Sequence, residues 1–230
     1  MHILTKYEQI LPPSISCPFV RVSETLELPA CATYAALCLW NFTIHDQTSL
    51  TKPDSLSVNT SFTRTKDEEW FFMVSAAIEA RGARIISLML KAIHSVNVND
   101  AQSVVRSLCQ VSEGIQGIAK TLERMYEKCG PSAFFHQIRP FLAGSKNMAT
   151  AGLPNGLFYD FGGGQGEWRQ YSGGSNAQSS LIQTFDIFLG VEHSATGEIK
   201  SNGAVQPPTK NGYLQVWYTM LLKRNTECSC

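Results

Sequence analysis

Residues 65–94 read TKDEEWFFMVSAAIEARGARIISLMLKAIH, and this stretch decides the fold class. It opens with Thr65-Lys66-Asp67-Glu68, which fits a capping box, a threonine followed three positions later by a glutamate. The residues that follow are apolar on most sides of a helix, which is typical of a helix in the middle of a bundle. The stretch therefore predicts a long buried helix from Thr65 to about His94.

A second long helix is predicted from Asp100 to Cys129. Asn99 or Asp100 would cap its start, and Gly130 followed by Pro131 would end it. Apolar residues recur along it at steps of three and four positions, which indicates an amphipathic helix. We expect this stripe to be the best-buried amphipathic face of the domain. It consists of Val104, Leu108, Val111, Ile115, Ile118, Leu122 and Met125.

Shorter helices are predicted on both sides of this pair. One covers residues 30–40 and begins behind Pro29, and another covers residues 132–142. A further helix follows a second capping box, Ser175-Asn176-Ala177-Gln178, and ends at Gly190. Together these segments predict an all-α protein built as a helical bundle.

The segments between the helices are predicted as loops. Residues 43–59 are polar, and residues 143–174 are rich in glycine; neither contains a convincing strand pair. We expect one helical domain over residues 1–192. Residues 193–230 are predicted to be a flexible loop followed by a divergent C-terminal tail.

The composition excludes several classes of function. Lys and Arg total 19 and Asp and Glu total 19, so the formal net charge is 0 and a large basic surface for nucleic acid is excluded. The longest charge-free run, residues 28–44, contains polar residues and predicts a buried helix rather than a membrane span. The first twelve residues do not fit a signal peptide, so we expect a cytoplasmic protein. Nothing in the sequence indicates an oligomeric state.

Motifs for metal and phosphate chemistry are absent from the sequence. The seven cysteines are odd in number and form no C-x-x-C pair, and the five histidines show no paired metal spacing. The glycine-rich stretch 161–174 contains no phosphate-loop motif. Gly173-Gly174-Ser175 approaches the hydrolase elbow, but no α/β pattern surrounds it, so an N-cap serine is the better interpretation.

Two polar residues stand among large apolar ones and have alternative interpretations. Ser75 lies four positions after Phe71, and its hydroxyl either bonds back to a main-chain carbonyl or points into a pocket. Arg139 lies among aromatic and aliphatic residues, where its guanidinium requires an anion. That anion is either Asp186 or the carboxylate of a ligand, and the residue chemistry does not separate the two.

Four segments, in order, resemble the indoleamine 2,3-dioxygenase family in its fungal form, over about residues 11–192. The first is Leu26-Glu27-Leu28-Pro29 followed by Tyr34, and the second is Trp70-Phe71-Phe72-Met73-Val74-Ser75. The third is Ser132-Ala133-Phe134-Phe135-His136-Gln137-Ile138-Arg139. The fourth is Gly173-Gly174-Ser175-Asn176-Ala177-Gln178-Ser179-Ser180 followed by Phe185-Asp186.

The resemblance implies a helical domain that holds haem b and inserts both atoms of O₂ into L-tryptophan or a related indole. The product would be N-formylkynurenine, the first step of tryptophan catabolism by the kynurenine route. By resemblance, Tyr34, Phe71 and Ser75 would line the distal pocket and Phe134 would pack on the indole. Arg139 would pair with the substrate carboxylate, which favours a ligand as its anion. Ser175 and Asn176 would lie at the haem propionates.

The sequence also departs from the family pattern. The family's small N-terminal domain is nearly absent, and the match fades after Tyr213-Leu214-Gln215, where the family continues to its proximal histidine. Residues 216–230 contain no histidine. His193 is the single histidine after the fourth segment, residues 173–186, which we call the haem-edge segment. Pro140 also biases Arg139 away from helical geometry. The alternative is therefore an inactive, truncated helical remnant without a proximal haem ligand, in which Phe185 and Leu189 are poorly covered.

Overall fold

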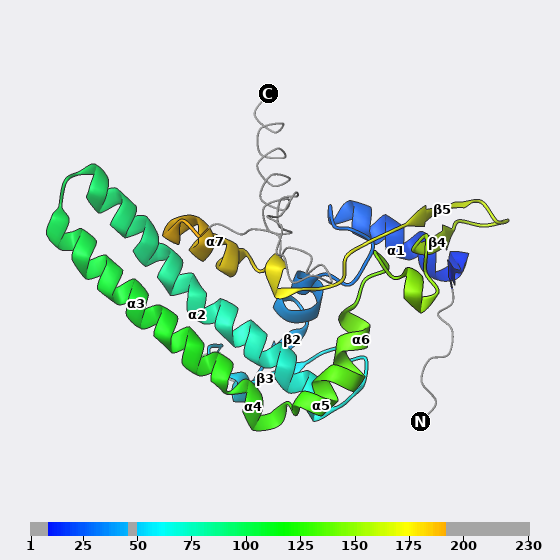
Figure 1. The fold of residues 1–230 in the computed structure, drawn as a ribbon, viewed down its shortest axis with the longest axis horizontal. Coiled ribbons are helices and arrows are strands. Elements are labelled where there is room, and N and C mark those ends of the chain that lie inside the picture. Colours follow the sequence, from blue (N-terminus) through cyan, green and yellow to red (C-terminus); the bar gives the residue numbers. More distant parts are fainter. Residues whose placement is uncertain (1–8, 46–49, 192–230) are drawn as a thin grey trace, which may run out of the picture. The chain divides into compact units, whose positions relative to one another are not determined.

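The computed structural model describes residues 9–45 and 50–191, and helices dominate them (Figure 1). This confirms the predicted all-α class, although short strands also occur. The chain divides into two compact units, one ending at Ser179 and the other beginning at Ser180. The predicted tail, residues 193–230 with His193, lies outside the described residues, so the boundary after residue 192 stays a prediction.

Helix α2 (Lys66–Asn97) is the predicted long helix and extends three residues beyond His94. The Thr65 hydroxyl accepts a hydrogen bond of 3.3 Å from the Glu68 N–H, which confirms the cap. Three acidic residues occupy the first turn, where the positive end of the helix dipole favours them. The Glu68 carboxylate, however, does not return to the Thr65 N–H as a capping box would require.

Glu68 instead binds the chain that leads into α2. Its buried carboxylate accepts hydrogen bonds from the Ser61 and Thr63 hydroxyls and from the N–H groups of Phe62 and Thr63, at 2.5–2.8 Å. Burial by itself would raise the pKa of Glu68, but these donors outweigh it and lower the pKa below its ordinary value. The entry to α2 is therefore organised around one ionised side chain.

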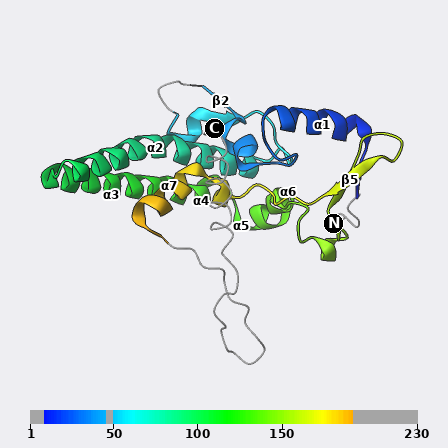
Figure 2. The ribbon, with the colours of Figure 1, turned by 90° about the horizontal axis from the view of Figure 1, so that it is seen from above.

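Helix α3 (Ala101–Glu123) runs back along α2, and Figures 1 and 2 show the two side by side. Asp100 caps it as predicted, since its carboxylate accepts the Ser103 N–H at 3.0 Å. The predicted stripe is wrong in part, because Leu108 and Leu122 are 44% and 51% exposed. The buried face instead comprises Ser107, Val111, Gly114, Ile118 and Thr121, with Gly114 half-buried.

Gly114 explains why small residues face α2. A Cβ atom on Gly114 would lie 2.7 Å from the Ile85 side chain, well inside van der Waals contact. The two helices therefore approach through the small residues of α3. The larger leucines of the predicted stripe are displaced to the flank of this contact.

Three short helical segments follow α3, namely α4 (Met125–Lys128), α5 (Pro131–Ala133) and α6 (Arg139–Leu142). A π-helical turn, Phe134–Ile138, separates the last two. Arg139 has helical dihedral angles, φ −51° and ψ −38°, despite the predicted bias from Pro140. The wider π turn ends before Pro140, which occupies the first turn of α6, where a missing N–H costs least.

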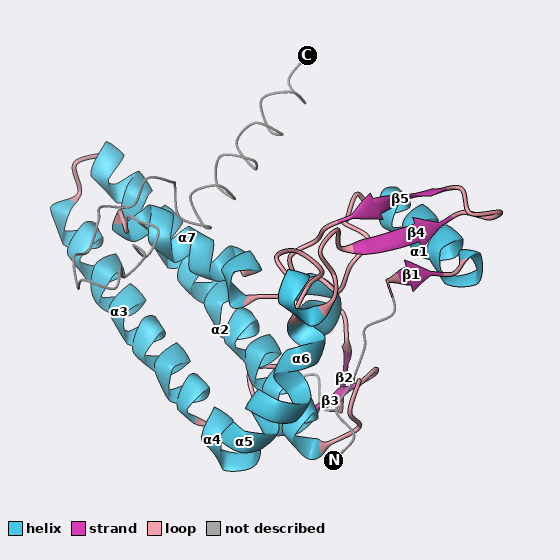
Figure 3. Cartoon of the chain, turned by 45° about the vertical axis from the view of Figure 1, so that its right-hand side comes forward, coloured by secondary structure: helices cyan, strands magenta, loops and turns pink. Residues whose placement is uncertain are grey.

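A small sheet lies beside helix α1 (Pro13–Thr25), as Figure 3 shows. Its strand order is β1-β4-β5, with β1 parallel to β4 and β4 antiparallel to β5. A second antiparallel pair joins β2 and β3. The prediction that residues 43–59 and 143–174 are loops is therefore wrong at four short strands: β2 (Phe42–Ile44), β3 (Leu56–Val58), β4 (Leu157–Asp160) and β5 (Gly166–Arg169). Strand β1 (Ile10–Leu11) lies outside both segments.

Glycines with positive φ permit the β4–β5 turn, and short length hides all five strands from periodicity. The remaining single-turn helices also lie between the long elements. They are the π turn Ala35–Leu39 and the 3₁₀ turns Pro53–Ser55, Ala149–Ala151 and Asn176–Gln178.

The second capping box also differs from its prediction. Ser175 caps the 3₁₀ turn Asn176–Gln178, and α7 (Ser180–Leu189) begins only after Ser179. On α7, Leu189 is 55% exposed, as expected, whereas Phe185 is buried at 8%. No helix in the described ranges is long and apolar enough to cross a membrane.

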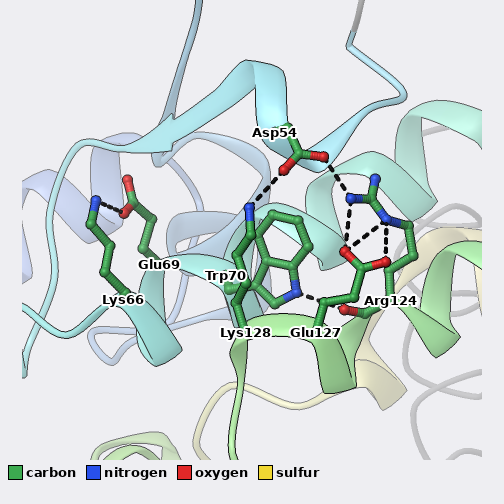
Figure 4. Close-up of polar contacts among 7 residues, drawn as sticks. All are labelled: Asp54, Lys66, Glu69, Trp70, Arg124, Glu127 and Lys128. Carbon is green, nitrogen blue, oxygen red and sulfur yellow. Dashed lines mark hydrogen bonds and ion pairs between the residues drawn. The ribbon is translucent and has the colours of Figure 1, made fainter.

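A charged cluster joins the 3₁₀ turn Pro53–Ser55 to α4 (Figure 4). The Asp54 carboxylate accepts hydrogen bonds of 2.6 Å from Arg124 and from Lys128. The Lys128 ammonium also lies 3.9 Å from the centre of the Trp70 ring. The Trp70 indole N–H donates to the Arg124 carbonyl at 2.7 Å, so one aromatic side chain of α2 fixes both α4 and this turn.

Candidate active site

One cavity of about 400 Å³ gathers most of the predicted site residues within the first compact unit. Its walls come from Tyr34 and the π turn that follows, the start of α2, the turn before α6, and the loop before α7. The lining residues include Tyr34, Phe71, Phe134, Arg139, Ser175 and Asn176. Six of the seven predicted residues thus border one space, although up to 142 positions separate them in the sequence.

Two phenylalanines form the aromatic wall of the cavity. Phe71 stands in the second turn of α2 and Phe134 begins the π turn, and their ring centres are 4.9 Å apart at 41°. Phe72 adds an edge-on contact with Phe71 at 5.5 Å. Such tilted and edge-on pairs are favourable aromatic geometries. The wall therefore presents an apolar surface suited to a flat aromatic ligand.

Arg139 lies at the rim of the same cavity. The side chain is exposed, so the premise of a buried guanidinium is wrong. Its guanidinium carbon lies 5.3 Å from the centre of the Phe135 ring, a cation–π distance that leaves the planar fork available to an anion. Asp186 belongs to the other compact unit, so the choice between Asp186 and a ligand stays a prediction.

Tyr34 and Cys38 also line the cavity; Tyr34 precedes the π turn Ala35–Leu39, and Cys38 lies on that turn. Both are buried, with exposed fractions of 6% and 2%. Burial raises the pKa of the Cys38 thiol to about 12, so the thiol is protonated near neutral pH. Burial, with the nearby Glu79 charge, also raises the pKa of Tyr34.

Ser75 does not line the cavity but lies one turn behind Phe71. Its hydroxyl donates to the Phe71 carbonyl at 2.9 Å, which is the back-bonding alternative for this residue. The side chain is 5% exposed and also hydrogen-bonds with the Cys38 thiol. Ser75 therefore reaches the cavity wall through Cys38.

Ser175 and Asn176 form an exposed polar edge of the cavity. The Ser175 hydroxyl accepts a hydrogen bond of 3.2 Å from the Ala177 N–H. Gly174 brings this loop close to the π turn, since a Cβ there would lie 2.7 Å from the Leu37 side chain. The close approach sets a polar edge beside an otherwise apolar cavity.

Sequence reasoning missed the lining residues Leu37, Cys38 and Leu142, and also Glu79, which lies behind the wall. Spacing offers a signal for two of them. Cys38 is four positions after Tyr34, and Glu79 is four positions after Ser75, so each shares a helical face with a predicted site residue. The π turns carry no comparable sequence signal.

The lining residues fit the distal face and edge of a haem better than its axial coordination. An aromatic wall with a polar rim suits a flat group that is apolar across its plane and charged at one edge. No histidine lines the cavity within the described ranges, and the protonated Cys38 thiol is a poor iron ligand. No group of three or more His, Cys, Asp and Glu suited to a metal ion occurs among the described residues either.

Comparisons with known proteins identify the family of the chain. The family model for indoleamine 2,3-dioxygenase matches residues 1–221. An indoleamine 2,3-dioxygenase of Aspergillus candidus is 46% identical over 196 residues, covering 83% of this chain and 48% of the relative. An indoleamine 2,3-dioxygenase of Saccharomyces cerevisiae is 41% identical, covering 84% and 44%. A 6-hydroxytryptophan 2,3-dioxygenase of Fusarium equiseti is 36% identical, covering 80% and 45%.

The fold and the shared segments therefore define a helical protein related to 2,3-dioxygenases. The chain belongs to the indoleamine 2,3-dioxygenase family. It spans about half the length of the curated relatives that it matches.

Proposed function

We propose that the cavity is the substrate side of a dioxygenase site that converts L-tryptophan or a related indole amino acid, with O₂, to N-formylkynurenine in the cytoplasm. One observation carries the proposal: the aromatic wall of Phe71 and Phe134 and the exposed guanidinium of Arg139 border the same cavity. Phe71 and Phe134 would hold the indole ring, and Arg139 would form a charge-assisted hydrogen bond with the carboxylate. Family membership supports this class of reaction.

Haem b is the cofactor that the family implies, and it would supply the redox chemistry with O₂. Ser175 and Asn176 would hold its charged edge by hydrogen bonds from the polar rim. A residue that ligates the iron would come from outside the described lining of the cavity. In sequence, His193 is the histidine nearest to the haem-edge segment, which makes it the first residue to test.

The second proposal is that the 230-residue chain by itself is an inactive remnant of the family. The observation that favours it is the lack of a histidine among the described lining residues. We therefore expect the chain, expressed alone, to bind haem loosely and to form little or no N-formylkynurenine.

Titration of the purified chain with haem, followed by an assay with L-tryptophan, O₂ and a reductant, separates these proposals. A spectrum without a histidine ligand and little product are expected from the chain alone. A stable histidine-ligated spectrum with rapid turnover would contradict the remnant proposal. His193→Ala must then abolish both signals if His193 is the ligand, whereas His45→Ala is the matched control.

A further inference from the structure

Glu79 lies on α2 one turn beyond Ser75, behind the cavity wall rather than on its surface. One of its carboxylate oxygens accepts a hydrogen bond of 3.0 Å from the Tyr34 hydroxyl. The same oxygen accepts a hydrogen bond of 2.5 Å from the Ser179 hydroxyl. These donors lie 45 and 100 positions away in sequence, so one oxygen joins three distant segments.

The bond to Glu79 determines which part of Tyr34 faces the cavity. Because the hydroxyl donates to the carboxylate behind the wall, the residue offers its ring to the lining. Burial and the Glu79 charge raise the pKa of Tyr34, so the phenol is protonated near neutral pH and its hydroxyl is a donor.

The loop before α7 is held at the same place by two independent bonds. Ser179 is 1% exposed and binds Glu79, while the Gln178 side chain accepts the Tyr34 N–H at 2.8 Å. Gln178 also donates to the Gly173 carbonyl at 3.3 Å, which closes the loop that carries Ser175. The loop that carries the polar rim is thus joined to Tyr34 directly by Gln178 and, through α2, by Glu79.

We propose that Glu79 is a positioning residue that fixes the distance between the Tyr34 ring, which lines the cavity, and the polar rim formed by Ser175 and Asn176. By doing so it sets the width of the cavity that receives the ligand. The effect on an indole ligand rests on the proposed function, whereas the effect on cavity geometry does not. Charge-assisted hydrogen bonds hold their partners at a better-defined distance than neutral ones, because they are shorter and stronger.

Alkylation of Cys38 by iodoacetamide, located by mass spectrometry, measures the geometry without haem or substrate. Cys38 lines the cavity, and Cys129 is buried in a separate core cluster with Trp70 and Ile138, so Cys129 reports global unfolding. Glu79→Leu removes the acceptor and should accelerate the reaction of Cys38 by roughly tenfold while Cys129 is unchanged. Equal acceleration of both thiols, or of neither, would overturn the proposal.

Conservative variants separate positioning from simple packing. Glu79→Gln loses the charge that helps to raise the pKa of Cys38, as Glu79→Leu does, but it keeps a carbonyl oxygen that accepts the same hydrogen bonds. Cys38 should therefore react clearly more slowly in the Gln variant than in the Leu variant. Tyr34→Phe should accelerate the reaction of Cys38 and not that of Cys129. Adding Tyr34→Phe to Glu79→Leu should have little further effect, because Glu79→Leu has already removed the Tyr34–Glu79 hydrogen bond. Additive effects, or a Gln variant as reactive as the Leu variant, would contradict the proposal. Glu113→Leu on the exposed face of α3 is the matched control.

A second experiment measures the affinity of the haem-loaded chain for L-tryptophan. Glu79→Leu should weaken L-tryptophan affinity by roughly tenfold and Glu79→Gln should restore it. Unchanged affinity together with faster Cys38 alkylation would overturn the claim that this spacing sets the fit of the ligand. Failure of wild type to bind L-tryptophan would count against the proposed function, and the Cys38 result would still decide the role of Glu79.

Discussion

Helix α2 carries two inward-facing carboxylates, Glu68 in its first turn and Glu79 about three turns later. The two carboxylates have different structural roles. All donors to Glu68 come from residues 61–63, immediately before the helix. The donors to Glu79 come from two segments that are remote in sequence. A carboxylate with local donors determines how a helix begins, whereas one with remote donors determines the shape of a site.

The largest effect on stability is expected from Glu68→Ala. This change removes the acceptor of four hydrogen bonds in a buried place, and should lower the free energy of unfolding by about 3 kcal/mol. Urea unfolding at pH 7 measures the loss. Glu69→Ala is the control, because it removes an i,i+3 ion pair with the exposed Lys66 and one favourable first-turn charge, and should cost about 0.5–1 kcal/mol. Similar losses for the two variants would break the comparison.

The pH dependence of stability should report Glu68 directly. Its folded pKa lies below its unfolded value, so its contribution is complete above the unfolded pKa of roughly 4.3 and disappears as the pH falls through the folded pKa. Urea unfolding at intervals between pH 7 and pH 3 should show a flatter acid limb for Glu68→Gln than for wild type. Parallel curves would show that Glu68 has no depressed pKa.

The α2–α3 contact offers a test that involves no charge. Gly114→Ala places a methyl group 2.7 Å from Ile85 and should destabilise the protein by about 1–3 kcal/mol. Gly117→Ala, three positions along the same helix, meets only the Arg81 side chain at 3.9 Å and should stabilise by about 0.5–1 kcal/mol through helix propensity. Thermal unfolding of both variants measures the contrast, and shifts of the same sign would refute the close approach at Gly114.

The smallest effect is expected at the Asp54 cluster. Arg124 and Lys128 lower the pKa of Asp54 by hydrogen bonds, but the carboxylate is half exposed and its ion pairs are screened by solvent. Asp54→Asn should therefore cost less than about 1 kcal/mol, and 1 M salt should reduce the difference from wild type. A larger cost that salt does not change would show that the cluster behaves as a buried network.

Local sequence signals predicted the long helices well. Thr65 and Asp100 cap them where the sequence indicates, because a cap depends on residues within three positions. The choice of buried face on α3 could not be predicted, because Gly114 and Ser107 are buried by the approach of α2 rather than by their own hydrophobicity. The short strands could not be predicted for a similar reason, since β1 pairs with β4 across almost 150 positions.

The site also contains residues that the sequence identified and a residue that it missed. Phe71, Phe134 and Arg139 were chosen by resemblance, and they border one cavity. Glu79 was missed because its partners, Tyr34 and Ser179, become its neighbours only after folding. Residues whose role depends on remote donors require the structure.

Ligand discrimination by Arg139 is the measurement that tests the central claim most directly. Calorimetric titration of the haem-loaded protein compares L-tryptophan with tryptamine, which has the same indole and no carboxylate. The account predicts that Arg139→Ala weakens L-tryptophan binding by about tenfold or more, the loss of a charge-assisted hydrogen bond, and leaves tryptamine binding unchanged. Equal losses for both ligands, or no loss for either, would contradict the assignment of this cavity to an indole amino acid.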